Sequence, residues 1–402
     1  MTDSIEINTL DQLRGNWNYP TSIHFGNGRI QELADACQQL SSKRPLLVTD
    51  SGLVQLPFVS QIIKSIEAAG LVINVFSQVK PNPTGTNIDD GVKAFQQGKH
   101  DGVIALGGGS ALDAGKAIAL MVGQDQPLWD FEDVGDNWLR VRPEGMAPTI
   151  AIPTTAGTGS EVGRASVIVD EASHSKKIIF HPDMLPKRVI ADPQLTVGLP
   201  PNITAATGLD ALVHNLEAYC APGYHPMADG IALEGMRLIK NHLPMAFTNG
   251  EDLVARSHML VASSMGATAF QKGLGAVHAL AHPLGALFDA HHGLLNAILL
   301  PYILVYNRPA IEGRLAHVAR CLELSDDSFS GLFDWLLGFR KQLAIPHSLQ
   351  EIGINDDRAD EIGQLALQDP SAAGNPIPLT AQQYSEIFIK AVRGELHEDR
   401  TA

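Results

Sequence analysis

The feature that most restricts the fold of this chain is a regular alternation of strand-like and helix-like segments between residues 45 and 195. The strand-like runs RPLLVTD, LVINVFSQV and DGVIALGG alternate with the helix-like stretches LPFVSQIIKSIEAAG and IDDGVKAFQQGKH. TIAIPTT and KRVIADP follow as further strands. Because parallel strands are joined by crossovers that are usually helical, this alternation predicts a parallel sheet covered by helices.

The pattern changes after residue 203. Long amphipathic helical segments such as TAATGLDALVHNLEAYCA and DGIALEGMRLIKNHL follow, with few strand signals. The LPP at 199–201 lies between the two patterns. We therefore predict an α/β domain at residues 1–199 and an all-α domain at residues 200–402.

Composition excludes several classes of partner. Lys and Arg number 29 against 44 Asp and Glu, a net charge of −15 with no basic block, which argues against nucleic acid and anionic membrane surfaces. Cys37, Cys220 and Cys321 are isolated and without CxxC spacing, as expected of a reducing cytoplasm. The N-terminal MTDSIEINTLDQLRG is polar and acidic, and we find no apolar run of the roughly 18 residues that a membrane span needs. We expect a soluble cytoplasmic protein.

Two loops of the α/β domain have the composition of a nucleotide site. In ALGGGSALDAGKAIAL an apolar strand runs into glycines and then a helix, whose first backbone N–H groups can receive a phosphate. The phrase is neither GxGxxG nor a Walker motif, and a tight structural turn is the alternative. PTTAGTGSEV offers further hydroxyls after the strand TIAI, at the strand end where open α/β sheets bind ligands. The candidate residues are Gly107, Gly108, Gly109, Ser110, Thr154, Thr155, Thr158 and Ser160.

Two further positions favour an adenine dinucleotide. Asp50 ends the strand RPLLVTD, where a carboxylate can accept hydrogen bonds from ribose hydroxyls and repel a 2′-phosphate, which favours NAD over NADP. Asn82 lies in the proline-restricted turn KPNPT and could touch the cofactor. An ordinary turn is the alternative at both positions.

The helical half contains a set of residues suited to a divalent metal. Asp210 and His214 are four residues apart, so a helix projects them from one face, and His278 and His282 repeat this spacing. Pro283 and nearby glycines predict a turn that brings His292 back towards this second pair.

One carboxylate and several imidazoles suit Fe²⁺ or Zn²⁺ better than Mg²⁺ or Ca²⁺. Any single one of these histidines is typical of a core residue, but the four histidines and Asp210 together favour a metal site. Spacing alone leaves His278 and His282 as equal candidates, and His291 as an alternative to His292.

Five phrases together resemble the iron-containing, or group III, alcohol dehydrogenases: GGGSALDAGKA, PTTAGTGSEV, DALVHNLEAY, GLGAVHALAHPLGA and HHGLLNAILLP. The resemblance covers residues 20–310, with the motifs in the family's order. It implies an N-terminal nucleotide-binding domain of a modified Rossmann type, a C-terminal helical metal-binding domain, and catalysis in the cleft between them.

The resemblance also assigns roles residue by residue. It implies that Asp210, His214, His278 and His292 bind the metal, and that His282 lies beside the metal, near the nicotinamide and the substrate. We therefore expect His282 either to relay a proton or to orient the substrate.

For the cofactor, the resemblance places the diphosphate near Gly108, Gly109 and Ser110, the nicotinamide side near Thr154, Thr155 and Thr158, and the adenosine near Asp50 and Asn82. A family lysine near the cofactor matches Lys177, and Lys176 fits almost as well. Family membership favours Fe²⁺ over Zn²⁺ and predicts a homo-oligomer, a dimer or larger.

The substrate expectation depends on AFQKGLGAVH, where many family members carry a small or amide pair in place of Gln271 and Lys272. This phrase and LPKRVIADPQLTVGLPPNITAATGLDALVHNLEAY are similar to those of the family's 4-hydroxybutyrate dehydrogenases. We predict a small primary alcohol, specifically a short ω-hydroxy acid whose carboxylate meets Lys272. A solvated surface lysine is the alternative at that position. The rival functions are a glycerol- or propanediol-type polyol dehydrogenase and a dehydroquinate synthase-like lyase.

Overall fold

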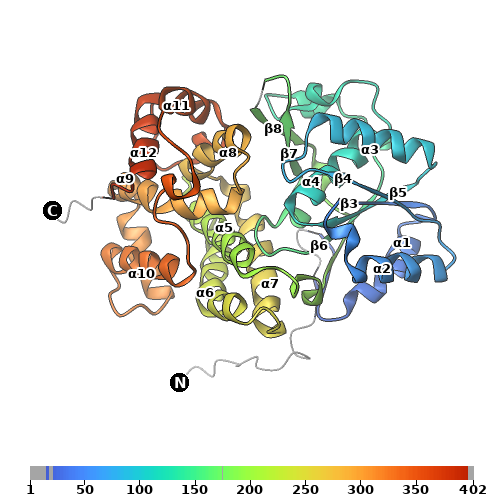
Figure 1. Ribbon diagram of the computed structural model, residues 1–402, viewed down its shortest axis with the longest axis horizontal. Coiled ribbons are helices and arrows are strands. Elements are labelled where there is room, and N and C mark those ends of the chain that lie inside the picture. The colour runs from blue at the N-terminus through green and yellow to red at the C-terminus, as the bar shows by residue number, and fades with distance from the viewer. Residues whose placement is uncertain (1–14, 18–20, 174, 397–402) are drawn as a thin grey trace. The chain divides into compact units, whose positions relative to one another are not determined.

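The computed structural model describes residues 15–17, 21–173 and 175–396 of the chain (Figure 1). Residues 1–14, on which the prediction about export largely depends, lie outside the described part. Contacts divide the chain into two compact units, the first Met1–Leu199 with Gly250–Leu260, the second Pro200–Asn249 with Val261–Ala402. In the first unit, the guanidinium of Arg256 donates hydrogen bonds to the carbonyls of Gly250 and Leu199, which ties the inserted segment to it.

The first unit contains a seven-stranded sheet in the order β1-β2-β9-β6-β5-β3-β4. All neighbouring pairs are parallel except β1 and β2. Every residue of β5 is buried, as expected of a central strand covered on both faces. The strands are β1 (Gly15–Trp17), β2 (Ile23–Phe25), β3 (Pro45–Asp50), β4 (Asn74–Val79), β5 (Gly102–Gly107), β6 (Thr149–Pro153) and β9 (Arg188–Ala191).

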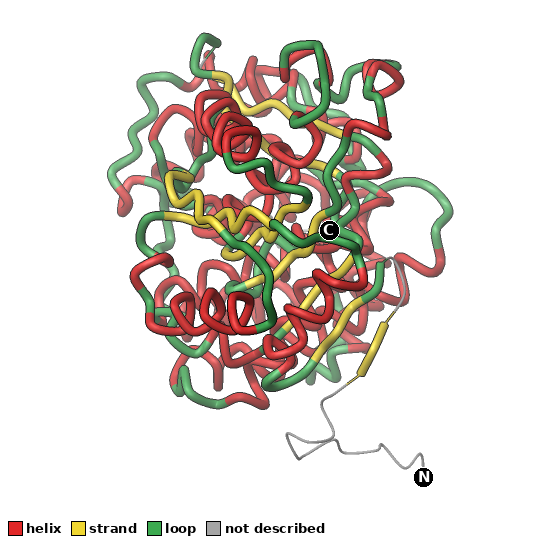
Figure 2. The backbone as a smooth tube through the Cα atoms, turned by 90° about the vertical axis from the view of Figure 1, so that its right-hand side faces the viewer, coloured by secondary structure: helices red, strands yellow, loops and turns green. Residues whose placement is uncertain are grey.

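Helices cover both faces of this sheet: α1 (Leu33–Gln39) and α2 (Pro57–Ala68) on one, α3 (Gly85–Gln97) and α4 (Gly109–Met121) on the other (Figures 1 and 2). The side chains of β3 alternate between two cores, since Leu46 and Val48 pack in the cluster of α3 and α4, while Leu47 packs in that of α1 and α2. The predicted Rossmann-like α/β arrangement is confirmed.

The strand order places a switch point between β3 and β5. The chain leaves β3 for β4 on one side and then returns to β5 on the other. In open α/β sheets, ligands bind beyond the carboxyl ends of the strands at such a point. Asp50 ends β3 and Gly107 ends β5, so two of the predicted cofactor positions lie there.

One feature of the first unit was not predicted from the sequence. Strands β7 (Ala165–Asp170) and β8 (Ser175–Phe180) form a separate antiparallel hairpin. It continues from the PTTAGTGSEV loop and contains Lys177.

The second unit is helical, as predicted. At its centre α5 is buried along its whole length from Thr204 to Cys220, and it packs on α6 and α9. A helix buried on all sides lies in the core, so its polar side chains, such as Asp210, His214 and Glu217, need partners there. The helices after residue 200 are α5 (Pro201–Cys220), α6 (Pro226–Thr248), α7 (Leu253–Ala269), α8 (Ala276–Phe288), α9 (His292–Cys321), α10 (Phe329–Gln342), α11 (Ala359–Gln368) and α12 (Ala381–Arg393). The first part of α7, up to Leu260, belongs to the first unit.

Helix α9 has the length and apolar composition of a membrane span, the one such helix in the described part of the chain. Of its most apolar stretch, 67% is buried inside the protein, and the helix packs against α5, α8 and α10. We therefore interpret α9 as a core helix.

The turn between the two histidine-bearing segments does not lie where the proline suggested. Helix α8 continues through Pro283 and ends at Phe288. The reversal comes at Asp289, whose φ of 50° places it in the left-handed region that Asp tolerates better than most residues. His292 begins α9 directly after this turn.

Candidate functional site

Four side chains of the helical unit converge on one point. Asp210 and His214 come from α5, His278 from α8 and His292 from the first turn of α9. Each offers one ligand atom, and these atoms all lie within 4.8 Å of one another. Three of the residues are buried and His292 is half-buried, so the group is largely removed from solvent.

The spacing of these atoms fits a divalent cation. Oδ1 of Asp210 lies 3.9 Å from Nε2 of His214 and 3.7 Å from Nε2 of His292. Ligands about 2.0–2.1 Å from a tetrahedral ion stand about 3.3 Å apart, so a small contraction would bring these donors to bonding distance. One carboxylate and three imidazoles are a donor set for Fe²⁺ or Zn²⁺.

A glycine allows α9 to approach α5 beside the cluster. A Cβ at Gly293 would lie 2.5 Å from the carbonyl oxygen of Ala206 and 3.0 Å from Cβ of Asp210. Any larger residue would push α9 away and move His292 from the other donors. The glycine of the HHG phrase is therefore required by close packing.

Asn296 is a neighbour that the sequence analysis missed. Its Nδ2 donates to Oδ1 of Asp210 at 2.7 Å and lies 3.2 and 3.1 Å from Nε2 of His278 and His292. Three lone-pair acceptors therefore face one partly positive amide group, as they would face a cation. The available signal was its position one turn after His292.

His282 lies beside this cluster and outside it. Its ring is 5.8 Å from that of His278 and 5.4 Å from that of His292, centroid to centroid. Its Nδ1 is 2.7 Å from Oδ2 of Asp369, a second residue that the sequence analysis missed. Burial opposes ionisation, but His282 and hydrogen bonds from Ser371 hold the pKa of Asp369 below its usual value. An ionised Asp369 accepts a hydrogen bond from Nδ1–H of His282, which leaves the lone pair on Nε2 available for chemistry.

The predicted substrate residue Lys272 is engaged within the protein. Its Nζ lies 2.7 Å from Oδ1 of Asp229 and donates to the carbonyl of Tyr219 at 3.2 Å, and the side chain is 3% exposed. The same carboxylate pairs with Arg314 at 3.0 Å. Lys272 is thus not a solvated surface lysine, but its ammonium already has an anionic partner.

In the α/β unit, the two predicted cofactor loops touch. Helix α4 starts at Gly109, and its cap residue Gly108 has no side chain to occupy the first N–H groups. A Cβ at Gly108 would lie 3.2 Å from Cγ2 of Thr155, and one at Gly109 would lie 2.6 Å from Cγ2 of Thr158. The glycines therefore permit the close approach of the PTTAGTGSEV loop, in which Thr154 is buried.

The KPNPT turn also reaches the glycine-rich loop. The hydroxyl of Ser110 donates to the carbonyl of Pro81, and the amide of Val169 donates to that of Pro83 at 2.8 Å. These two bonds fix the turn on either side of Asn82. The hydroxyl of Ser110 thus has a structural partner as well as its predicted place near the diphosphate.

The two carboxylate oxygens of Asp50 point in different directions, one into the following turn and one towards the end of β5. Its Oδ1 accepts hydrogen bonds from the amides of Gly52 and Leu53 at 2.9 and 2.8 Å. A Cβ at Gly107 would lie 3.9 Å from its Oδ2, so this oxygen faces the end of β5. The turn role and the predicted ribose role use different oxygens.

Lys177 is held within the hairpin. Its Nζ lies 3.1 Å from Oδ2 of Asp170 and 3.5 Å from Oε2 of Glu132, and 5.3 Å from the ring centre of Trp129. Burial opposes its charge, but the two carboxylates raise its pKa. Lys176 precedes it on the strand and projects from the opposite face, so the two lysines are not interchangeable.

A set of buried contacts next to the predicted cofactor loops was not predicted from the sequence. Lys116 of α4 is fully buried, and its Nζ donates to the carbonyls of Ser160 and Ala165 and lies 3.2 Å from Oδ1 of Asp113. Oδ2 of Asp113 accepts the amide of Val167 at 2.9 Å. The helix that begins at the glycine-rich loop therefore also anchors the end of the PTTAGTGSEV loop.

A cation-binding geometry in one unit and a dinucleotide-type sheet in the other define a class, the metal-dependent nucleotide-binding enzymes. Comparison with known proteins is more specific. Residues 20–193 match the family model described as iron-containing alcohol dehydrogenase, and residues 204–392 match the C-terminal model of the same family. The chain belongs to the iron-containing alcohol dehydrogenase family, and is an oxidoreductase.

Its relatives act on several alcohols. A 4-hydroxybutyrate dehydrogenase of Cupriavidus necator is 37% identical over 93% of this chain and 99% of that protein. An NAD-dependent methanol dehydrogenase of Bacillus methanolicus is 33% identical over 94% of this chain and 100% of that protein. A crystal structure of a 1,3-propanediol oxidoreductase, 34% identical, superposes with a TM-score of 0.87 over 92% of this chain and 97% of that one. Family membership thus implies metal and NAD binding.

Proposed function

We propose that this protein is an NAD-dependent alcohol dehydrogenase that interconverts a short ω-hydroxy acid, such as 4-hydroxybutyrate, and its semialdehyde. The observation that carries the proposal is the convergence of Asp210, His214, His278 and His292, whose donor atoms lie within 4.8 Å of one another. These four residues hold an Fe²⁺ ion, or a Zn²⁺ ion with the same donors. The enzyme is cytoplasmic and forms a homo-oligomer.

The metal, NAD and the protein side chains have separate roles in the proposed reaction. When bound, the cation supplies Lewis acidity that favours the alkoxide form of an alcohol, and NAD supplies the hydride acceptor. His282 takes the hydroxyl proton at Nε2 in oxidation and returns it in reduction, while Asp369 holds the other ring nitrogen. Gly108, Gly109 and Ser110 receive the diphosphate at the start of α4.

We propose the remaining cofactor contacts from the family resemblance of the α/β unit. Thr154, Thr155 and Thr158 face the nicotinamide half, and Asp50 accepts hydrogen bonds from the ribose, with Asn82 beside the adenosine. A carboxylate at position 50 also disfavours the 2′-phosphate of NADP. Lys177 orients the hairpin beside the cofactor through Asp170 and Glu132.

Two observations bear on the hydroxy-acid substrate in opposite directions. The 37% identity to a 4-hydroxybutyrate dehydrogenase supports it. The pairing of Lys272 with Asp229 weighs against Lys272 as the carboxylate ligand, because the ammonium would have to share its charge with a second anion. We propose the hydroxy-acid substrate on the basis of this relative. We also propose that Lys272 contacts the substrate carboxylate, and the Lys272→Met variant tests that contact.

Metal-stripped protein, reconstituted separately with Fe²⁺ and with Zn²⁺, tests the function. We expect metal-dependent NADH formation, measured by absorbance, with 4-hydroxybutyrate preferred over 1,3-propanediol and 1-butanol. NADP⁺ serves as the control for the role of Asp50. Preference for 1,3-propanediol would support the metal site and show that the substrate is a diol and not a hydroxy acid. No reduction with any metal, together with phosphate release from the dehydroquinate synthase substrate, would replace the dehydrogenase with a lyase.

Replacing Lys272 with Met decides its role. If the ammonium binds the substrate carboxylate, KM for 4-hydroxybutyrate rises far more than KM for 1-butanol, which has the same chain length and no charge. Equal effects on the two substrates would show that Lys272 acts only through its bonds to Asp229 and Tyr219.

A further inference from the structure

Glu217 is a buried carboxylate on the same helix as two of the proposed metal ligands, and the sequence motifs assigned it no role. Positions 210, 214 and 217 are separated by four and three residues, so α5 presents Asp210, His214 and Glu217 on one face. Glu217 is 7% exposed. Within the described residues its one ion-pair partner is His278.

The two oxygens of Glu217 make different contacts. Oε1 accepts the backbone N–H of Val277 at 2.8 Å, in the first turn of α8. Oε2 lies 2.6 Å from Nδ1 of His278. One carboxylate therefore fixes both the start of the helix and the ring of the ligand that the helix carries.

The contact with Nδ1 decides which nitrogen of His278 faces the other donors. A carboxylate can only accept, so a neutral imidazole bound to it carries its proton on Nδ1. Nε2 is then left with a lone pair, and Nε2 is the atom that lies near Asn296 in the ligand cluster. With the opposite tautomer, Nε2 would bear a proton and could not bind a metal.

The two carboxylates of α5 relate to the cluster in different ways. Asp210 offers an oxygen directly to the group of donor atoms. Glu217 reaches that group only through the ring of His278. The position of Glu217 is therefore that of a partner to a ligand histidine.

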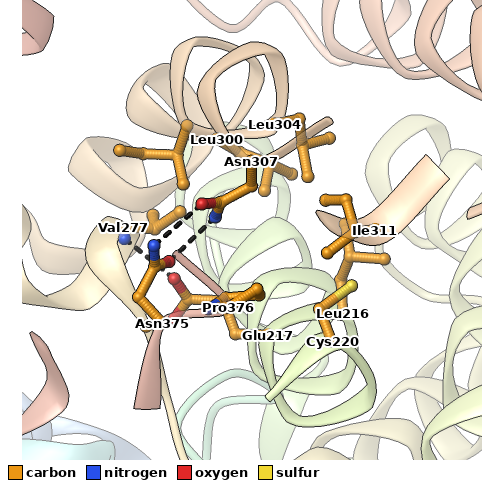
Figure 3. Close-up of a pocket in the computed structure, with 12 residues that line it drawn as sticks. Leu216, Glu217, Cys220, Val277, Leu300, Leu304, Asn307, Ile311, Asn375 and Pro376 are labelled. Atoms are coloured by element: carbon orange, nitrogen blue, oxygen red, sulfur yellow. Dashed lines mark hydrogen bonds between the residues drawn. The ribbon is translucent and has the colours of Figure 1, made fainter. Parts of the chain in front are cut away.

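The surroundings keep the carboxylate in this position. Figure 3 shows Glu217 beside the paired amides of Asn307 and Asn375. A Cβ at Gly275, which precedes α8, would lie 2.9 Å from Oε1 of Glu217 and 3.0 Å from Oδ1 of Asn375. A glycine at this position therefore lets the carboxylate reach the helix start.

A role limited to capping α8 does not account for these contacts. Asn375 already caps the helix through a hydrogen bond from the amide of Ala276 to its Oδ1 at 3.1 Å. A neutral side chain could have served Val277 without burying a charge. We infer that Glu217 is a positioning residue of the metal centre, which orients His278 and fixes its tautomer. The inference rests on the metal site of the proposed function.

Replacement of Glu217 with Gln tests the inference by metal binding, without an assay of activity. The amide keeps the shape, but removes the charge and cannot accept from both Val277 and His278. Metal-stripped full-length protein is titrated with Co²⁺, whose visible spectrum reports the ligand geometry. We expect Kd to rise roughly 10–100-fold, the usual effect of losing the outer partner of a ligand histidine, with an altered spectrum.

Asp369→Asn is the matched control, because Asp369 makes the same bond to His282, which is not in the ligand set. This variant should keep the wild-type Co²⁺ affinity. Folded Glu217→Gln protein with wild-type affinity, or equal losses in both variants, would overturn the assignment.

Two further outcomes are informative. If Glu217→Gln does not fold, Gly275→Ala takes its place, because its Cβ displaces the carboxylate and leaves every ligand intact. Wild-type Co²⁺ affinity in Gly275→Ala would then overturn the role of Glu217. Wild-type protein that binds no Co²⁺ would instead refute the metal site, and with it the basis of the inference.

Discussion

The proposed metal centre of the helical unit and the proposed cofactor loops of the α/β unit are built from different parts of the chain. The metal centre consists of side chains from α5, α8 and α9. Glu217 contacts one of its histidines, His278, and Asp369 contacts the neighbouring His282. The cofactor loops depend on backbone at the ends of β5 and β6, where glycines allow close contact. A substitution in the first region should therefore act through lost ligands, and one in the second through added bulk.

The largest expected effect is the loss of a ligand. Asp210→Asn removes the one anionic donor of the cluster, so the purified protein should contain little metal. The fall in kcat/KM should exceed the roughly 10–100-fold that loss of an outer partner costs. Metal analysis and steady-state kinetics measure these effects. NAD affinity should stay at the wild-type value, and a parallel loss of NAD binding would show that the two regions are not independent.

The next largest effect distinguishes the proton-transfer role of His282 from the metal-binding role of His278. Asp369→Asn allows its amide to donate to Nδ1 of His282 and so to place the imidazole proton on the wrong nitrogen. We expect kcat to fall roughly tenfold or more, since acid–base groups contribute about 10²–10⁴. Metal content, measured on the same preparation, should be unchanged. A wild-type kcat would remove His282 from proton transfer.

These two aspartates also show what the sequence could reveal. Asp210 was predictable because its helical partner His214 is four residues away, and Glu217 continues that face, a signal that was present and overlooked. Asp369 meets His282 across 87 residues. No local pattern encodes such a contact, because it depends on how α11 ends against α8.

The α/β unit was predictable for a similar reason. The sheet follows from the alternation of strands and helices, and burial of central strands such as β5 and β6 on both faces makes their runs apolar. The β7–β8 hairpin was overlooked because it lacks a continuous apolar run. In β7 half-buried residues alternate with buried ones, and β8 is mostly half-buried and includes two lysines. The turn predicted near Pro283 was wrong, because α8 continues through that residue.

A smaller effect tests the second region. Gly109→Ala would place a Cβ 2.6 Å from Cγ2 of Thr158, so one of the two loops must shift. Overpacking of this kind costs about 1–3 kcal/mol. If the displaced loop loses that much of its interaction with NAD, the NAD Kd rises roughly 5- to 150-fold. Titration of the metal-loaded protein with NAD measures it, and metal content is the control. Wild-type NAD affinity would exclude this loop from the cofactor site.

The smallest effect concerns the ion pair of Lys272 in the helical unit. Lys272→Met removes one of the two cations that contact Asp229, and Arg314 remains. We expect the free energy of unfolding to fall by about 1 kcal/mol at neutral pH, less than for a buried pair left without any partner. Methionine fills most of the space of the lysine stem, which limits the loss of packing.

The pH dependence of the stabilisation by the Lys272–Asp229 ion pair follows from the pKa of Asp229. Burial favours the neutral acid, but Lys272 and Arg314 outweigh it and hold the pKa of Asp229 below the unfolded value of about 3.9. The stabilisation is therefore present above that pH and is lost as the pH falls through the folded pKa. The difference in unfolding free energy between wild type and Lys272→Met, measured by urea denaturation, should be full at neutral pH and should shrink below about pH 4. A difference independent of pH would mean that Lys272 stabilises the fold through the carbonyl of Tyr219 and its apolar stem, and not through Asp229.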